Sequence, residues 1–472
     1  MSDLDPFDNN NPKHKSNNRS EEDVRRFREL LRNGAKDINN PEALEEIIQF
    51  YFEHEKFEDA LTYADRLLSF EPYNADVWQR KGMILNNLFQ YEKALDCFDK
   101  AMGLNPTDPE VLINRGITLD NLNKIDESIA SFDKALEIDP VHEDALFHKG
   151  VTLEKLERFG EAIVIFDQVL QIDPDHIDAW YELGYCYDFL DKPTESIRCY
   201  DEHINRDPYN FNAWYNKGIV ENRIGHFTKA IESYEYALAI KEDFSAAWYN
   251  MGNAYANLGR LQDAIRCFKT TLIYAPKDAA ALNNLGNAYE ELNDFNEAIT
   301  CYSAAIEIDN KNHESFFGKG CCYDALGQTM PALTNYQKAT ELNPDYAEYW
   351  YACGDALYNL GRIDECLECY LKVINLDPKD PEIWFDLGDT FGEKGAYNEA
   401  LKALGECIRL DPKFAPAYFS KGKVLLAMNA KAEAPNEFFI AFSLAPDMKK
   451  DFEQLFPNLI GDWLFAHLFE KH

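Results

Sequence analysis

Asparagine and tyrosine recur at a fixed spacing in the middle of the chain. Asn216, Asn250 and Asn284 are 34 residues apart, and Tyr181 and Tyr215 belong to a second column with the same interval. An asparagine amide both donates and accepts hydrogen bonds, so a regular ladder of amides can bind an extended main chain whatever its sequence. The candidate peptide-binding residues are Tyr181, Tyr215, Asn216, Asn222, Tyr249, Asn250, Asn253, Asn257, Asn283, Asn284 and Asn287.

Other residues capable of chemistry point to structure rather than catalysis. Cys366 and Cys369 form a C-x-x-C, but the slot of Cys369 also holds cysteine in four other copies of the repeat described below, which favours a small core residue. We expect His203 to be a hydrogen-bonded interior histidine. No phosphate-binding loop, dinucleotide fingerprint or H-E-x-x-H is present. The sequence therefore predicts no enzyme, no catalytic residue, no metal site and no cofactor.

A single period positions all of these residues. Eleven glycines recur at intervals of exactly 34 residues from Gly82 to Gly422, without insertion or deletion. Six of the seven tryptophans precede one of these glycines by four residues. A small residue follows twelve residues after the glycine and a large apolar or aromatic one after sixteen, as in Ala264 and Phe268. Proline closes most units. Self-similarity of this length is the signature of a repeat array.

Each unit predicts two helices and a turn. With Gly82 as position 8, positions 4, 8 and 11 share one helical face, and so do positions 20, 24 and 27. Position 15 is often glycine or asparagine, which tolerate the left-handed conformation that ends a helix. A glycine inside a helix costs about 0.5–1 kcal/mol relative to alanine. We expect close packing of the two helices to compensate for that cost.

The pattern W-x2-L-G-x2-Y … A-x3-F-x2-A … P resembles the tetratricopeptide repeat (TPR) family. Residues 245–278 show it as Trp248, Gly252, Tyr255, Ala264 and Phe268, followed by Pro276. The resemblance covers twelve units over residues 41–448 and implies an all-α, right-handed α-solenoid superhelix of helix-turn-helix units. In this family the concave groove, lined by the first helices, usually holds a peptide or a folded partner.

The asparagine set itself resembles the ladder in the superhelical TPR region of O-linked N-acetylglucosamine transferases. Tyrosine at position 5 and asparagine at positions 6 and 9 are also common in TPR units generally, so two interpretations stay open. Carboxylates occupy the same predicted groove, mainly at positions 2 and 12. Those at position 2 are Asp76, Glu110, Asp144, Asp178, Glu314, Glu348 and Glu382.

The two ends differ from the array. Residues 1–20 predict a disordered polar tail, and residues 21–40 a short helix and linker. Residues 449–472 predict a capping or aromatic helical segment, with Phe452, Leu455, Phe456 and Leu459 on one capping helix. Trp463 and the apolar residues after it could instead serve docking or dimerisation.

Charge and composition narrow the partners. The net charge is −36 over 472 residues, which disfavours nucleic acid and anionic membrane surfaces. It suits other proteins or peptides, including basic segments. The absence of an export signal in the polar first 20 residues and the 11 cysteines predict a cytoplasmic location.

These observations predict a protein–protein interaction scaffold or adaptor that binds an extended peptide or a partner protein in its concave groove. Two alternatives remain at this stage. The chain could be a structural subunit of an assembly, held through its convex face or C-terminal segment. It could also be the regulatory arm of a separately encoded enzyme. The sequence does not fix the oligomeric state.

Overall fold

The chain is an all-α solenoid of helix-turn-helix units. The structure is a computed structural model that describes residues 40–465 and 468; within these residues there are 25 α-helices, one short 3-10 helix and no strand. The helices form two compact units, one ending at Ile224 and the other beginning at Gly225. The expected tail at 1–20 and nearly all of the helix and linker at 21–40 lie outside the described residues.

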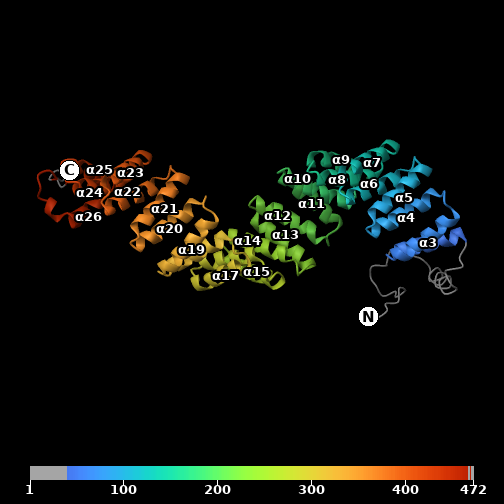
Figure 1. Cartoon of the computed structure of the whole chain (residues 1–472), viewed down its shortest axis with the longest axis horizontal. Helices are drawn as coiled ribbons and strands as arrows, with labels where there is room; N and C mark the ends of the chain where they lie inside the picture. Colours follow the sequence, from blue (N-terminus) through green and yellow to red (C-terminus); the bar gives the residue numbers. More distant parts are fainter. Residues whose placement is uncertain (1–39, 466–467, 469–472) are drawn as a thin grey trace. The chain divides into compact units, whose positions relative to one another are not determined.

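In the first unit, helices alternate between a 13-residue first helix (the A helix) and a 14-residue second helix (the B helix). The bounds are α2 Pro41–Glu53, α3 Phe57–Phe70, α4 Ala75–Asn87, α5 Tyr91–Leu104, α6 Pro109–Asn121, α7 Ile125–Ile138, α8 Glu143–Lys155, α9 Phe159–Ile172, α10 Ile177–Phe189, α11 Pro193–Arg206 and α12 Phe211–Arg223. Consecutive helices lie side by side in this unit (Figure 1).

The second unit begins with a B helix and continues the alternation of A and B helices through α25, although α22 has 14 residues and α25 has 11. The bounds are α13 Phe227–Ile240, α14 Ser245–Asn257, α15 Leu261–Tyr274, α16 Ala279–Glu291, α17 Phe295–Ile308, α18 His313–Ala325, α19 Thr329–Leu342, α20 Ala347–Asn359, α21 Ile363–Leu376, α22 Pro381–Lys394, α23 Tyr397–Leu410, α24 Ala415–Ala427, α25 Ala434–Leu444, α26 Met448–Leu455 and the 3-10 helix η3 Pro457–Leu459.

The turn inside each pair confirms the predicted left-handed residue. Gly225, Gly259, Gly327, Gly361 and Gly395 have φ between 70° and 83°, and Asn293 has φ 62°. The same turn position also holds non-glycine residues that the conformation disfavours, among them Phe89 at 58° and Glu157 at 58°. The geometry of the turn is therefore imposed by the packing of the two helices and not by the glycine alone.

The glycine at position 8 lets the two helices of a pair approach closely. A Cβ built on Gly82 would lie 2.5 Å from Cε1 of Phe98, and one on Gly286 would lie 2.6 Å from Cε1 of Tyr302. The aromatic ring at position 24 thus covers the glycine of its own pair. Burial of these rings, which are 0% exposed in Phe98 and Tyr302, supplies the stabilisation that offsets the poor helix propensity of glycine.

The first pair reaches the same packing with the sizes exchanged. Ile48 occupies the glycine position and is 1% exposed, while Ala64 stands where other pairs have a ring and is 0% exposed. Both belong to one apolar cluster between α2 and α3. A large residue against a small one fills the same volume in either order, so the pair keeps a close-packed interior without its glycine.

Where position 4 of an A helix is tryptophan, its indole N–H joins that pair to the one before it. The indole N–H of Trp180 donates to the carbonyl of Pro174 at 3.0 Å, and Trp350 donates to Pro344 at 2.8 Å. Trp78 and Trp384 make the equivalent bonds to Pro72 and Pro378. The residue that closes one unit therefore also accepts a hydrogen bond from the next.

The C-terminal segment covers part of the last helix pair but is not one continuous helix. Phe452 lies 4.7 Å from Phe438 between ring centroids, and Phe452 and Phe465 are fully buried. The expected helix through Leu459 was wrong, because α26 ends at Leu455, two residues before Pro457, which has no N–H to continue it. Leu455 is 58% and Trp463 81% exposed.

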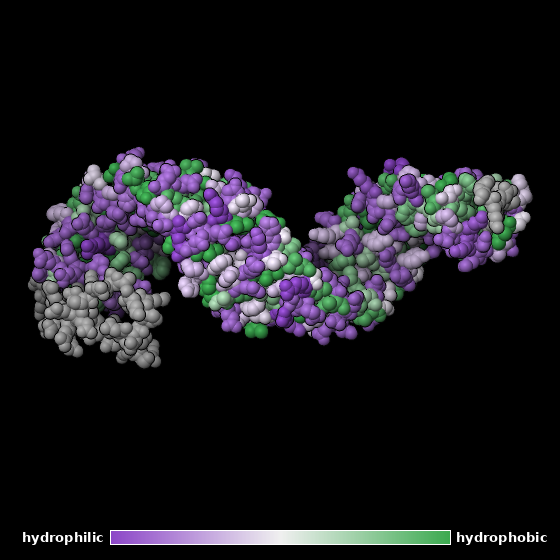
Figure 2. Space-filling model, turned by 180° about the vertical axis from the view of Figure 1, so that it is seen from behind, coloured by the Kyte–Doolittle hydropathy of each residue, from purple (hydrophilic) through white to green (hydrophobic). Residues whose placement is uncertain are grey.

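One face of the molecule is mostly hydrophilic (Figure 2). Purple residues spread over the face shown in Figure 2, interrupted by small apolar patches. Among the described residues, no helix is long and apolar enough to cross a membrane.

Candidate functional site

Two hydrogen bonds of the same kind join neighbouring A helices at the candidate peptide-binding residues. In the first unit, Nδ2 of Asn216 in α12 donates to Oη of Tyr181 in α10 at 2.8 Å. In the second unit, Nδ2 of Asn284 in α16 donates to Oη of Tyr249 in α14 at 3.0 Å. We call these two bonds the Tyr–Asn links. Each joins position 5 of one pair to position 6 of the next, 35 residues later.

The phenol ring of each link packs against another aromatic ring in addition to accepting its hydrogen bond. The Tyr181 ring lies 5.8 Å from the Tyr200 ring beneath it, and the Tyr249 ring lies 6.0 Å from that of Phe268. Burial raises the pKa of Tyr181, so its hydroxyl stays protonated. Because each phenol oxygen accepts from an amide, its own O–H hydrogen is left to donate to another acceptor.

The link of the second unit extends into a small amide network. Nδ2 of Asn284 also donates to Oδ1 of Asn253 at 2.8 Å. Asn283 turns inward and is 4% exposed; its Oδ1 accepts from the hydroxyl of Ser315 at 2.7 Å. Of these three asparagines, Asn253 and Asn284 are half-buried at the surface, whereas Asn283 supports the packing of α16 against α18.

The remaining candidates are placed less uniformly. Asn287 is exposed, and its Oδ1 accepts from the hydroxyl of Tyr302 at 2.7 Å. Asn257 is exposed near the end of α14. The amide oxygen of Asn222 is buried and accepts no hydrogen bond within the described residues. Tyr215 and Asn250 are half-buried on α12 and α14. The structure therefore brings some of the predicted residues into two clusters, one in each unit.

A third bond with the same spacing involves a residue that the sequence reasoning missed. The hydroxyl of Tyr351 in α20 donates to Oδ2 of Asp386 in α22 at 2.7 Å. Burial raises the pKa of Asp386 to about 6, although the bond from Tyr351 opposes that shift. The 35-residue interval from position 5 to position 6 could have identified this pair.

Carboxylates surround the link of the first unit. Glu154 in α8 and Glu182 in α10 lie beside each other, and burial together with the Glu154 charge raises the pKa of Glu182. Burial also raises the pKa of Glu154, whose carboxylate accepts from the thiol of Cys186 at 3.8 Å. Two carboxyls that are partly removed from water hold a proton more readily, and a cationic side chain would replace that proton.

The cysteines and His203 take the structural places that we expected. Cys366 and Cys369 are 0% and 6% exposed in one apolar cluster, and burial raises the pKa of the Cys366 thiol to about 12. A thiol with so high a pKa is not a nucleophile at neutral pH. His203 is 1% exposed, and its Nδ1 lies 2.9 Å from the carbonyl oxygen of Ile177.

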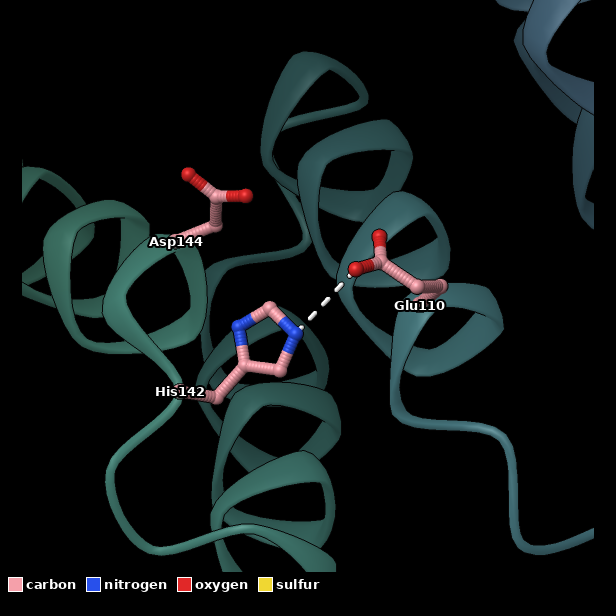
Figure 3. A group of neighbouring side chains, drawn as sticks. All are labelled: Glu110, His142 and Asp144. Atoms are coloured by element: carbon pink, nitrogen blue, oxygen red, sulfur yellow. Dashed lines mark hydrogen bonds and ion pairs between the residues drawn. The ribbon is translucent and has the colours of Figure 1, made fainter.

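One group within the described residues has the side chains to hold a metal ion. It consists of Glu110, His142 and Asp144, whose potential ligand atoms all lie within 4.8 Å of one another (Figure 3). The sequence reasoning missed this group because its members come from two consecutive helix pairs. The separation of 32 residues between Glu110 and His142 is unlike the local spacing of known metal motifs.

The fold and these bonds define a helical repeat protein whose A helices carry polar, hydrogen-bonding side chains. Models described as tetratricopeptide repeat match residues 75–108, 113–177, 153–216, 249–313 and 381–414. A model described as TPR repeat matches residues 220–259, 323–361 and 354–395. Together these matches span well over half of the chain. The chain belongs to the tetratricopeptide repeat family.

Several solved structures are similar to parts or most of the chain. MamA is 25% identical over 34% of this chain and 95% of its own, with a TM-score of 0.34. YrrB, titled a TPR protein with an unusual peptide-binding site, is 25% identical over 40% of this chain and 98% of its own, with a TM-score of 0.37. The Cut9–Hcn1 hetero-tetramer of APC/C is 13% identical over 92% and 97%, with a TM-score of 0.39.

No curated protein matches the chain. The TPR repeats themselves support a role as a protein–protein interaction scaffold, because repeats of this family bind other proteins or peptides.

Proposed function

We propose that the chain is a non-enzymatic scaffold whose A helices bind an extended peptide segment of a partner protein through its main chain. The orientation of the Tyr–Asn links carries the proposal. In both links the amide donates and the phenol accepts, so a hydroxyl hydrogen is left on Tyr181 and on Tyr249. A peptide carbonyl is the acceptor that such a donor needs.

The second unit supplies the complementary group. The Nδ2 of Asn284 donates to Tyr249 and to Asn253, and its amide oxygen accepts from Nδ2 of Asn283 at 3.5 Å. An amide oxygen has two lone pairs, so the second one can accept from a peptide N–H. The Asn253 oxygen is used, and its amide hydrogens are left to donate. Donors and acceptors thus alternate along α14 and α16, as they do along an extended main chain.

The preferred peptide carries lysine or arginine. The paired carboxyls of Glu154 and Glu182 lie near Tyr181, and the chain has a net charge of −36. A basic side chain would bind between the carboxylates and displace the proton that burial holds there. Charge complementarity of this kind mainly speeds association and selects partners, while the hydrogen bonds fix the register of the peptide.

The test begins with peptides selected from a random display library against the full chain. Their affinity is then measured for wild type and for the variant Asn216→Ala/Asn250→Ala/Asn284→Ala, with Asn296→Ala as the matched control. Asn296 is an exposed asparagine on the B helix α17. We expect the triple variant to bind at least tenfold more weakly, since each lost hydrogen bond costs about 1 kcal/mol, and the control to bind as wild type.

Equal affinities for all three proteins would refute the proposal, provided that circular dichroism shows the same helicity. The triple variant includes Asn250 and therefore covers the three asparagines at position 6 that belong to the candidate peptide-binding residues.

A second candidate function rests on the C-terminal segment. Trp463 is 81% exposed next to a buried cluster that contains Phe465 and Phe452. Tryptophan is enriched among the residues that dominate the binding energy of protein interfaces. If the chain is a structural subunit held through this segment, Trp463→Ala will release its partners while the affinity for library peptides stays unchanged.

A further inference from the structure

Three side chains meet where one helix pair of the first unit ends and the next begins. Glu110 lies in the first turn of α6, Asp144 lies in the first turn of α8, and His142 is the residue that precedes α8. Nε2 of His142 lies 3.1 Å from Oε1 of Glu110. Figure 3 shows the imidazole between the two carboxylates.

His142 stands at a position where a side chain normally caps the following helix, but it does not do so. The equivalent residues Asn74, Asp108 and Asn210 each accept a hydrogen bond from a backbone N–H in the first turn of the next helix. His142 makes no such bond. Its Nδ1 is buried and has no hydrogen-bond partner within the described residues. Helix capping therefore does not account for this imidazole.

The same position in the next pair provides an internal comparison. Nδ1 of His176 accepts from the backbone N–H of Ala179 at 3.1 Å and so caps α10. Its Nε2 is 3.6 Å from the nearest oxygen of Glu143. Within the described residues, His176 belongs to no group whose ligand atoms lie close enough to share an ion. His142 and His176 occupy the same position of the repeat, but Nδ1 caps the following helix only in His176, and only His142 has its Nε2 within 3.1 Å of a carboxylate.

One imidazole nitrogen and two carboxylate oxygens form a donor set that suits zinc and neighbouring divalent transition metals. At metal–ligand distances of about 2.0–2.2 Å, ligand atoms around a tetrahedral ion lie roughly 3.3 Å apart. The His142–Glu110 distance of 3.1 Å already matches that spacing. The potential ligand atoms of the three residues lie at most 4.8 Å from one another. The Asp144 carboxylate is exposed, so its side chain can rotate and bring an oxygen closer to the other two ligand atoms.

We propose that Glu110, His142 and Asp144 bind one divalent transition-metal ion of the zinc type. The Glu110 side chain is 54% exposed and the His142 side chain 15% exposed, so an ion can enter from solvent and keep at least one water ligand. Because the ligands come from α6 and from the start of α8, the ion joins two consecutive pairs. Its binding free energy adds to the stability of that junction.

The test uses the untagged full chain after treatment with a chelator. Zinc binding is measured by calorimetry, and cobalt(II) is used as a spectroscopic probe of the ligands. The key variant is His142→Asn, because asparagine is a favoured cap and will preserve the start of α8. His176→Asn is the matched control, and Glu110→Gln removes a second ligand while keeping the shape of the side chain.

We expect wild type and His176→Asn to bind zinc with the same affinity. His142→Asn and Glu110→Gln should each bind that ion at least about tenfold more weakly, since loss of even an outer-shell partner costs 10–100-fold. The cobalt complex of wild type should show no thiolate charge-transfer absorption, because the proposed ligands contain no sulfur.

Three results would overturn the proposal. The first is that wild type binds no zinc after treatment with the chelator. The second is equal zinc affinity in wild type and His142→Asn, which would mean that the Glu110–His142 contact is only an ion pair. The third is thiolate absorption in the cobalt complex, which would place the ion at a cysteine.

Discussion

The region around Tyr249 and Asn284 and the region around Tyr351 and Asp386 use one geometry with opposite hydrogen-bond direction. In the first, an amide donates to the phenol at 3.0 Å; in the second, the phenol donates to a carboxylate at 2.7 Å. Both bonds run from position 5 of one helix pair to position 6 of the next. The residue at position 6 therefore decides whether the tyrosine hydrogen is available to a ligand or is already used.

The same geometry therefore serves two different tasks in this chain, depending on the residue at position 6. A carboxylate at position 6 holds the phenol and adds negative charge, so the surface near α22 is suited to a cation. An asparagine at position 6 instead donates to the phenol oxygen, so the surface near α14 and α16 offers neutral donors and acceptors. In the proposed function, the peptide main chain binds to surfaces of the second kind.

The largest expected effect comes from the packing beneath both regions. Gly286→Ala would place a Cβ 2.6 Å from the ring of Tyr302, and Gly354→Ala would place one 2.5 Å from that of Tyr370. Each should lower the free energy of unfolding by about 1–3 kcal/mol, because overpacking forces the helices apart. Chemical denaturation measures this. The control Gly405→Ala meets nothing within 4 Å and should be neutral or stabilising.

Exchanging the residue at position 6 sharpens the comparison directly. In Asn284→Asp the new carboxylate can only accept, so Tyr249 must donate to it as Tyr351 donates to Asp386. The hydroxyl hydrogen proposed for the peptide is then used, and we expect about tenfold weaker binding of a selected peptide. Fluorescence anisotropy with the labelled peptide measures it. Unchanged affinity would mean that the direction of the link does not matter.

A tyrosine that is bonded only within its own pair should affect stability and not binding. Oη of Tyr302 lies 2.7 Å from Oδ1 of Asn287 and 2.6 Å from Oε2 of Glu290, and its one hydrogen is shared between these two acceptors. Tyr302→Phe should cost about 1 kcal/mol of unfolding free energy and leave peptide affinity within twofold. A larger loss of affinity in an otherwise stable variant would place Asn287 in the binding site.

The smallest expected effect is a change in pH dependence at Asp386. Burial raises its pKa from 3.8 to about 6, so the folded protein binds the proton more tightly than the unfolded chain. Its favourable contribution is complete below pH 3.8 and is lost as pH rises through about 6. The Asp386→Asn variant has no carboxyl here and does not lose this stability. Its free energy of unfolding relative to that of wild type should therefore rise between pH 3.8 and about 6, by about 1 kcal/mol or less because solvent screens the partly exposed group. Denaturation at several pH values measures it, and a constant difference would contradict the account.

The repeat register could be predicted from sequence because its signals are local and redundant. Glycine at position 8, the large residue at position 24 and the left-handed turn each identify the same two helices, and the φ values at Gly259 and Asn293 confirm the turn. Even the first pair has one small and one large residue at positions 8 and 24, with the large residue, Ile48, at position 8 and the small one, Ala64, at position 24. Backbone periodicity fixes which residues share a face, and so the buried place of Cys366 and Cys369 could also be predicted.

What each polar side chain contacts could not be predicted in the same way. Asn284 and Asn283 are neighbours on α16, but one contributes to a surface link and the other is buried against Ser315. Whether an amide is free depends on the residue 35 positions away, in another pair, and on the exact rotation of both helices. The group of Glu110, His142 and Asp144 was missed for the same reason, since its members meet only after two pairs have packed.

The most direct test of the central claim is a double-mutant cycle between the protein and the peptide main chain. A selected peptide is compared with analogues in which single amides are replaced by esters, against wild type and Asn284→Ala. If the Asn284 oxygen accepts from a peptide N–H, one ester should weaken binding to wild type but not to the variant, with a coupling energy of about 1 kcal/mol. If the effects of the ester and of the substitution add at every position, the amides do not contact the main chain and the central claim is wrong.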